Sequence, residues 1–154
     1  GIGKSFAEAY AKAQLGAGKK MSSEGCVFLS VRKSDQEFIA ELASEFHDLG
    51  FKIVATKGTA NFISRINLPV TIVKKVQEGR PHVVDMMKNG DIQLVVSTTE
   101  GRQSILDSAS IRRTALEEKI YCTTTLEGGR AVCSVLRNKE SWNVDRLQDL
   151  HAKL

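Results

Sequence analysis

The chain has 154 residues, a length that fits one domain with a sizeable core. Its hydrophobic fraction of 42% and charged fraction of 26% are ordinary for a globular protein. The formal net charge is +4, and lysine and arginine are spread along the chain without a dense run or interleaved aromatic residues. This pattern disfavours a nucleic-acid-binding protein, whereas a modest basic excess suits an anionic metabolite.

Membrane and metal sites are also disfavoured. No apolar stretch approaches the roughly 20 residues of a membrane-spanning helix, and no signal-peptide pattern opens the chain, so we expect a cytoplasmic protein without membrane contact. The cysteines are odd in number and lack paired spacing, which argues against disulfides or a zinc site; we expect Cys26, Cys122 and Cys133 to be reduced and buried. His82 with Asp85 offers at most two metal ligands.

The first part of the chain predicts a helix and a linker. Residues 6–15 alternate small, apolar and charged types as a helix does, and glycines follow. Residues 19–24 are polar. Because the chain starts at Gly1 without Met, we expect residues 1–24 to be the end of a preceding domain with its connecting helix and linker, and residues 25–154 to form the domain itself.

From residue 25 onward, short apolar runs alternate with amphipathic segments. Strands are predicted at residues 26–31, 51–55, 71–76, 92–96 and 120–123. Helices are predicted near residues 38–49, 60–66, 82–88, 108–118, beyond 127, and at 144–153, with capping boxes at residues 34–37 and 124–127.

Strands that alternate with helices of about ten residues imply βαβ units and a parallel sheet. Right-handed crossovers then place helices on both faces of the sheet. The sequence therefore predicts an α/β fold, a Rossmann-like three-layer sandwich with a central parallel sheet of about five strands.

Three of the predicted strands end in turns rich in hydroxyl side chains and glycine. These turns are residues 56–59 (TKGT), 97–101 (STTEG) and 123–129 (TTTLEGG). In a parallel sheet they would share the carboxyl edge, where open α/β folds bind ligands. Hydroxyls and unpaired N–H groups at helix starts suit an anion, so we predict a site for a phosphate-bearing small molecule. The alternative is that the threonines only cap helices.

Several motifs occur in the order and spacing of a known family. They are residues 25–32 (GCVFLSVR), 55–60 (ATKGTA), 75–82 (KVQEGRPH), 97–102 (STTEGR) and 111–113 (IRR). With these motifs the chain resembles the C-terminal allosteric domain of the large subunit of bacterial-type carbamoyl phosphate synthetase, a member of the methylglyoxal-synthase-like group. The opening residues 3–15 resemble the end of the preceding synthetase domain and its connecting helix.

The resemblance implies a regulatory domain that does no chemistry. Such domains bind nucleoside monophosphates, UMP as inhibitor and IMP as activator, and adjust distant synthetase sites. The parent would be an ATP-dependent, glutamine-hydrolysing ligase of arginine and pyrimidine biosynthesis that uses ATP with Mg or Mn, whereas this domain would hold no cofactor. The implied partners are the synthetase domains of the same chain and a small glutaminase subunit.

The resemblance also assigns effector contacts. The family's phosphate contacts fall on Thr56 and Thr59, its basic partner on Lys75, and its polar pair on Ser97 and Thr99. The neighbouring Lys57 and Thr98 complete the expected phosphate site, and further candidate contacts are Ser30, Gln36 and His82. No residue is expected to be catalytic.

Three departures from the family pattern bear on ligand choice. Ser97 stands where the family often has Asn, and Gln36 where some members have a phosphate-binding Lys, so Lys57 or Lys75 would have to supply the missing charge. A Tyr-Asp pair that helps to hold ornithine in relatives falls on Cys122 and Thr123. We therefore expect nucleotide binding, whereas these two replacements weigh against regulation by ornithine.

Two other functions remain open. A methylglyoxal-synthase-like lyase acting on dihydroxyacetone phosphate would need a carboxylate base at the phosphate site. Its family carries an aspartate after the third strand, whereas residues 78–82 (EGRPH) lack one and offer only the nearby Glu78. An interaction domain without a ligand would ignore nucleotides. His82 itself has three possible roles, which are to cap a helix, to pair with Asp85 or to contact ligand.

Overall fold

A computed structural model describes residues 1–19, 21–138 and 146–152. At its centre lies a five-stranded sheet in the order β3-β2-β1-β4-β5, with every neighbouring pair parallel. The strands are β1 (Cys26–Ser30), β2 (Lys52–Thr56), β3 (Val70–Val73), β4 (Leu94–Ser97) and β5 (Tyr121–Thr123). The predicted α/β fold with a parallel sheet of five strands is confirmed.

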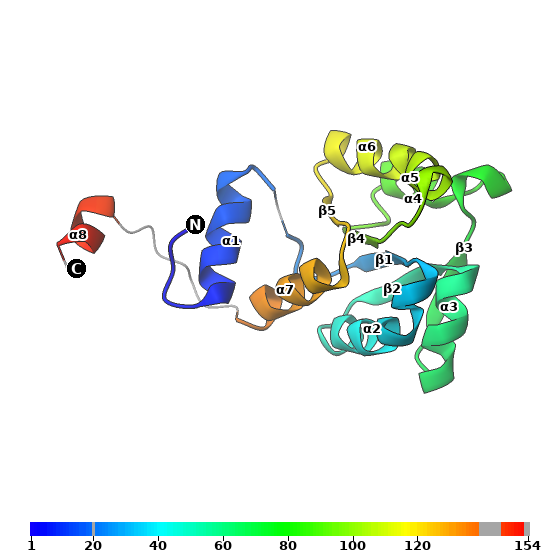
Figure 1. Cartoon of the computed structure of the whole chain (residues 1–154), viewed down its shortest axis with the longest axis horizontal. Coiled ribbons are helices and arrows are strands. Elements are labelled where there is room, and N and C mark those ends of the chain that lie inside the picture. The colour runs from blue at the N-terminus through cyan, green and yellow to red at the C-terminus, as the bar shows by residue number, and fades with distance from the viewer. Residues whose placement is uncertain (20, 139–145, 153–154) are drawn as a thin grey trace.

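Helices cover both faces of this sheet and make a three-layer sandwich (Figure 1). One layer contains α2 (Ile39–Asp48), α3 (Lys57–Ile63) and α7 (Leu126–Arg137). The opposite layer contains α4 (Val83–Lys88) and α6 (Ala109–Glu117), with the short α5 (Arg102–Asp107) beside them.

The strands form because their apolar side chains alternate between two buried faces. In β1, Val27 and Leu29 pack in the cluster under α2 and α7, while Phe28 packs with the cluster under α4 and α6. All three side chains are buried. A strand that is covered on both faces has a nearly continuous apolar run, as the central strands of this sheet do.

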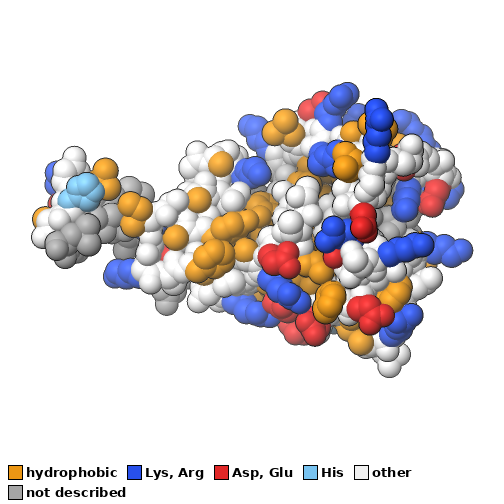
Figure 2. Space-filling model, in the orientation of Figure 1, with side chains coloured by type: hydrophobic (Ala, Val, Ile, Leu, Met, Phe, Trp, Pro, Cys, Tyr) orange, Lys and Arg blue, Asp and Glu red, His pale blue; other side chains and the backbone are white. Residues whose placement is uncertain are grey.

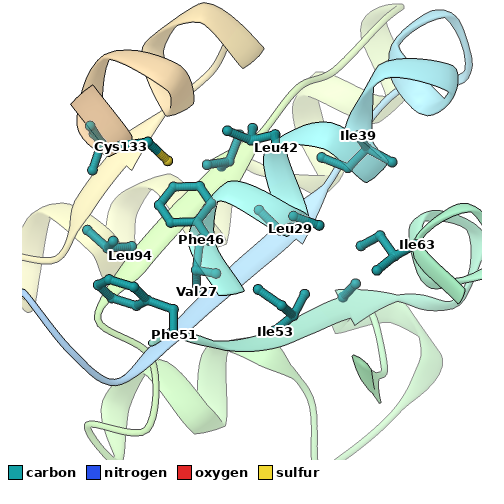
Figure 3. Close-up of a cluster of buried hydrophobic side chains, with 14 of the residues drawn as sticks. Val27, Leu29, Ile39, Leu42, Phe46, Phe51, Ile53, Ile63, Leu94 and Cys133 are labelled. Atoms are coloured by element: carbon teal, nitrogen blue, oxygen red, sulfur yellow. The ribbon is translucent and has the colours of Figure 1, made fainter. Parts of the chain in front are cut away.

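The larger core cluster lies between the sheet and α2 (Figure 3). Phe46 projects from α2 toward the sheet and meets the ring of Phe51 edge-on, with centroids 5.8 Å apart. Leu42 lies one helical turn before Phe46 on the same face and is also fully buried. This layer fixes α2 above β1 and β2.

Helix α1 (Phe6–Gly16) lies outside the sandwich against α7 (Figure 1). Ala7 and Ala11 pack on Val135 of α7, and the hydroxyls of Tyr10 and Tyr121 are hydrogen-bonded at 2.5 Å. Burial, and then the bond to Tyr10, raise the pKa of Tyr121. The predicted helix at residues 6–15 is confirmed.

Near the other end of the chain, α8 spans Leu147–His151. Of the helix predicted at 144–153, residues 144, 145 and 153 lie outside the described residues.

The capping box predicted at residues 34–37 is wrong. Residues 33–38 instead form a 3-10 helix, η1 (Lys33–Phe38), and α2 begins only at Ile39. The Ser34 hydroxyl faces the carboxylate of Asp35, which also holds the Arg32 guanidinium at 3.0 Å, so Ser34 caps no backbone amide. The chain therefore leaves β1 as a tight polar segment before it turns into α2.

The expected burial of the cysteines is correct for Cys133 but wrong for Cys26 and Cys122, which are half-buried. All three thiols are free. Burial raises the pKa of the Cys133 thiol to about 12. In the described part of the chain, no three His, Cys, Asp or Glu side chains are grouped to hold a metal ion. None of its helices is long and apolar enough to cross a membrane.

Candidate functional site

The strand order places a crevice at the carboxyl edge of the sheet. The chain moves outward from β1 through β2 to β3 on one side, and then continues with β4 and β5 on the other. Ser30 and Ser97 end β1 and β4 in register at this reversal. Open α/β sheets bind ligands at such a point, and a cavity of about 410 Å³ lies here.

Most of the predicted effector contacts line this cavity, which we call the edge pocket. They are Ser30, Gln36, Thr56, Lys75, Ser97, Thr98 and Thr99. The rest of its wall is formed by Phe28, Val31, Arg32, Lys33, Val76, Gln77, Val83, Glu100, Ser104, Asp107, Ser108 and Ile111. The turns after β2 and β4 therefore do meet at one site, as the hydroxyl pattern predicts.

Three predicted contacts lie elsewhere. Lys57 is exposed at the first position of α3 and does not line the edge pocket. His82 caps α4, where its Nδ1 accepts from the Asp85 amide at 3.3 Å and its own amide donates to the Asp85 carboxylate at 3.0 Å. Of the three roles considered for His82, these hydrogen bonds show the capping role.

Thr59 is the third residue outside the pocket lining, and it supports the site from behind. Its side chain is 1% exposed, and its Oγ1 accepts a hydrogen bond from the Val31 amide at 3.0 Å. Thr98 acts in the same way, since its Oγ1 accepts from the Arg32 amide at 3.0 Å. Two threonine hydroxyls therefore hold the segment that leaves β1.

A chain of hydroxyls connects this support to the pocket. Thr56 Oγ1 lies 3.2 Å from Thr59 Oγ1 and 3.5 Å from Ser30 Oγ. Each hydroxyl is one donor and an acceptor, and the proton rotates to suit its surroundings. Thr56 is the donor toward both Thr59 and Ser30, so the Ser30 proton is available to an acceptor in the pocket, and the Thr56 hydroxyl can rotate toward one.

Charged side chains are distributed unequally around the pocket. Lys75 follows β3, which ends at Val73 rather than at residue 76 as predicted, because the chain turns there into the 3-10 helix η3 (Val76–Glu78). The Lys75 backbone amide donates to the Glu78 carboxylate at 2.8 Å, and no ion pair of the Lys75 ammonium group occurs among the described residues. Asp107, at the end of α5, accepts from Gln103 at 2.7 Å and from Gln77.

The turn after β5 does not reach the edge pocket. Its Thr124 and Thr125 line a neighbouring cavity of about 330 Å³, which shares Arg32, Thr98 and Thr99 with the first. Thr125 Oγ1 accepts from the Gly128 amide at 3.0 Å and caps α7, so Thr125 rather than Thr124 is the capping residue. In this turn, therefore, the threonine caps a helix, which is the alternative to the predicted anion contact.

The sequence patterns did not indicate that Ser104, Asp107 and Ser108 form part of the pocket wall. These residues follow the β4 turn on α5 and at its end, whereas the helix predicted near residues 108–118 begins only where this wall ends. Their spacing of three and four places them on one helical face, which was the available signal. Ser108 caps nothing with its side chain, because its hydroxyl donates to the Ile105 carbonyl at 3.1 Å.

A comparison with the sequence models of known protein families shows which family this chain matches. The sequence model of the MGS-like domain family matches residues 38–124, which carry the turns after β2 and β4. The chain belongs to the MGS-like domain family. The resemblance that the motifs indicated is thereby confirmed.

Curated relatives of this MGS-like domain are much longer proteins. It is 57% identical over 152 residues to the carbamoyl phosphate synthase large chain of Pseudomonas aeruginosa, and 53% identical over 154 residues to that of Pseudomonas syringae pv. tomato. The corresponding protein of Neisseria gonorrhoeae is 43% identical over 155 residues. The matches cover 99–100% of this chain but only 14% of each relative.

Proposed function

We propose that this MGS-like domain is the effector-binding part of a carbamoyl phosphate synthase large chain and binds UMP or IMP in the edge pocket. The observation that carries the proposal is the convergence of Thr56, Ser97 and Thr99 with the Lys75 ammonium group in one cavity. At about 410 Å³, the cavity falls within the usual range of about 300–1,000 Å³ for small-molecule sites.

The phosphate fits the end of the pocket at β2 and β1. A phosphate dianion offers only acceptor oxygens. Ser30 has a hydroxyl proton to donate, and the Thr56 hydroxyl, which donates to Thr59 in this structure, can rotate toward the ligand. Lys75 supplies a charge-assisted bond, which is stronger than one between neutral groups. Thr59 takes part indirectly, since it holds both Thr56 and the Val31 amide in place.

The sugar and base fit the wall contributed by η3, α5 and α6. Asp107 presents a carboxylate that can accept bonds from ribose hydroxyls, and Gln77 beside it offers both a donor and an acceptor. Val76 and Ile111 give apolar surface for a planar base. The phosphate, the sugar and the base of a nucleoside monophosphate therefore each match the chemical groups of one part of the pocket.

The role in the parent protein rests on similarity. The relatives are named carbamoyl phosphate synthase large chain, and we propose that the parent is an ATP-dependent, glutamine-hydrolysing ligase with Mg or Mn at its own sites and a glutaminase subunit as partner. The domain itself does no chemistry and holds no cofactor. A nucleotide changes activity by binding two states of the parent with different affinity.

Residues 1–24 are proposed to connect this domain to the part that precedes it. Helix α1 buries Ala7 and Ala11 against α7 but leaves Phe6 65% exposed and Leu15 56% exposed. Large apolar side chains that stay exposed on a docked helix suit a neighbouring domain. On the face shown in Figure 2, by contrast, acidic side chains lie among the Lys and Arg side chains of the sandwich.

The nucleotide proposal is tested by calorimetric titration of the purified domain with UMP and with IMP. We expect at least one of them to bind saturably at one site per chain. Saturable binding is the direct consequence of a single pocket with both phosphate and base contacts. Absence of heat with both nucleotides, confirmed by equilibrium dialysis, contradicts the proposal.

One observation favours the lyase alternative, namely the Asp107 carboxylate in the edge pocket. Glu78 is not among the lining residues, and its carboxylate accepts from the Lys75 amide. Asp107 is held by two glutamines and is therefore suited to accept bonds rather than to take a substrate proton.

We accordingly expect incubation with dihydroxyacetone phosphate to give no methylglyoxal above the buffer rate. Turnover that disappeared with Asp107→Asn would instead establish the lyase.

A further inference from the structure

The edge pocket contains more cationic side chains than its strand-end motifs indicated. Lys75, Arg32 and Lys33 all line it, whereas Lys57, which was expected to supply charge, does not. This inference rests on the proposed nucleotide function and concerns how the same pocket selects a phosphate.

Arg32 is already committed to other groups. Its Nε donates to the Asp35 carboxylate at 3.0 Å, and its amide donates to Thr98 Oγ1 at 3.0 Å. Its charge is thus largely balanced within the protein. Lys33 differs, because its exposed side chain has no hydrogen bond or ion pair in the described residues.

The backbone that carries Lys33 is fixed beside the proposed phosphate position. The hydroxyl oxygens of Thr59 and Thr98 accept hydrogen bonds from the backbone amides of the two residues before Lys33. The following η1 helix lies against the start of α3, since the Gln36 amide nitrogen is 3.6 Å from the place that a Cβ on Gly58 would occupy. Lys33 therefore sits on an anchored segment next to the β2–α3 turn, not on a free loop.

The strand order shows how the two lysines relate to Thr56. Strands β3, β2 and β1 are neighbours in the sheet, and Thr56 ends the middle one. Lys75 follows β3 and Lys33 follows β1, so they approach from the strands on either side of Thr56. An anion bonded to Thr56 would therefore have a pocket-lining lysine on the strand-end segment at each side.

We propose that Lys33 is a second phosphate-binding cation, which faces Lys75 across the ligand and makes the pocket selective for a dianionic phosphate over a neutral nucleoside. Two cations match the two charges of a phosphate monoester near neutral pH. Lys33 comes from the segment between β1 and α2, and none of the hydroxyl-rich strand-end turns contains it.

The test is a calorimetric comparison of Lys33→Ala and Lys57→Ala with the unchanged domain, using UMP, IMP and the nucleosides uridine and inosine. Lys57 is the matched control, because it is an exposed lysine near Thr56 that does not line the pocket. We expect Lys33→Ala to weaken monophosphate binding about tenfold, as for loss of a charge-assisted bond, and to leave nucleoside binding unchanged. Lys57→Ala should bind every ligand like the unchanged domain, and Lys33→Arg should retain most of the affinity.

The outcomes separate this inference from the proposed function. If the unchanged domain binds a monophosphate and Lys33→Ala binds it equally well, Lys33 has no phosphate role but the nucleotide site stands. Equal weakening by Lys57→Ala would show a general effect of net charge and would overturn the inference. If the unchanged domain binds no nucleotide, the proposed function fails and the inference with it. Circular dichroism checks that each variant is folded.

Discussion

Replacing Lys75 with alanine is expected to weaken binding of the monophosphate ligand about ten- to a hundredfold. The variant loses a cation that lines the edge pocket, and a hydrogen bond to a charged group contributes roughly 1.5–3 kcal/mol. Folding should be unaffected, because the side chain is exposed and the described structure gives it no ion pair. Titration calorimetry at fixed salt measures the change.

Lys74→Ala provides the control for this variant. Lys74 is the adjacent residue, is also exposed and does not line the edge pocket, so its removal changes net charge equally without removing a pocket group. We expect Lys74→Ala to bind like the unchanged domain. If the two variants lose the same affinity, or neither loses any, the phosphate does not lie beside Lys75.

Replacing Phe46 with alanine is expected to lower the free energy of unfolding by about 3–5 kcal/mol, the usual range for a buried phenylalanine. Phe46 is fully buried, and its ring packs edge-on against Phe51 (Figure 3). For a domain of this size, each kcal/mol moves the melting midpoint by roughly 2–4 °C, so the decrease should be roughly 6–20 °C.

Phe38→Ala is the matched control for Phe46→Ala. Phe38 is 54% exposed at the end of η1 and belongs to neither side of the sheet core. Its removal should change the melting midpoint much less, because little buried contact is lost. Similar decreases for the two variants in thermal or urea unfolding would contradict the assignment of Phe46 to the main core.

The fold could be predicted because its signals are local. Each strand is a short apolar run, each is followed by an amphipathic helix, and this alternation leaves a parallel sheet as the consistent arrangement. The position of Thr56 and Ser97 at one site could be predicted from the parallel sheet alone, because the carboxyl ends of parallel strands lie at the same edge. The register of Ser30 with Ser97 shows how closely β1 and β4 bring their ends together.

The parts that could not be predicted depend on contacts between distant segments. The backbone amides of Val31 and Arg32 donate hydrogen bonds to Thr59 and Thr98. Hydrogen bonds between such distant segments cannot be recognised from the local sequence pattern. They turn the chain into η1 and bring Lys33 to the pocket, where a capping box and an ordinary helix start were expected. Lys57, which was expected beside the phosphate, is the first residue of α3, and its exposed side chain does not line the pocket.

The most direct test of a phosphate-anchored nucleotide site compares UMP with uridine, and IMP with inosine, by their effect on the melting midpoint of the domain. A ligand that binds only the folded state at a hundred times its dissociation constant adds about 2.7 kcal/mol. At roughly 2–4 °C per kcal/mol, the monophosphate that binds should therefore raise the midpoint by roughly 5–11 °C. The matching nucleoside at the same concentration should raise it far less, because the hydroxyls and lysines of the pocket would have no anion to hold. Equal shifts for nucleoside and monophosphate would contradict the account.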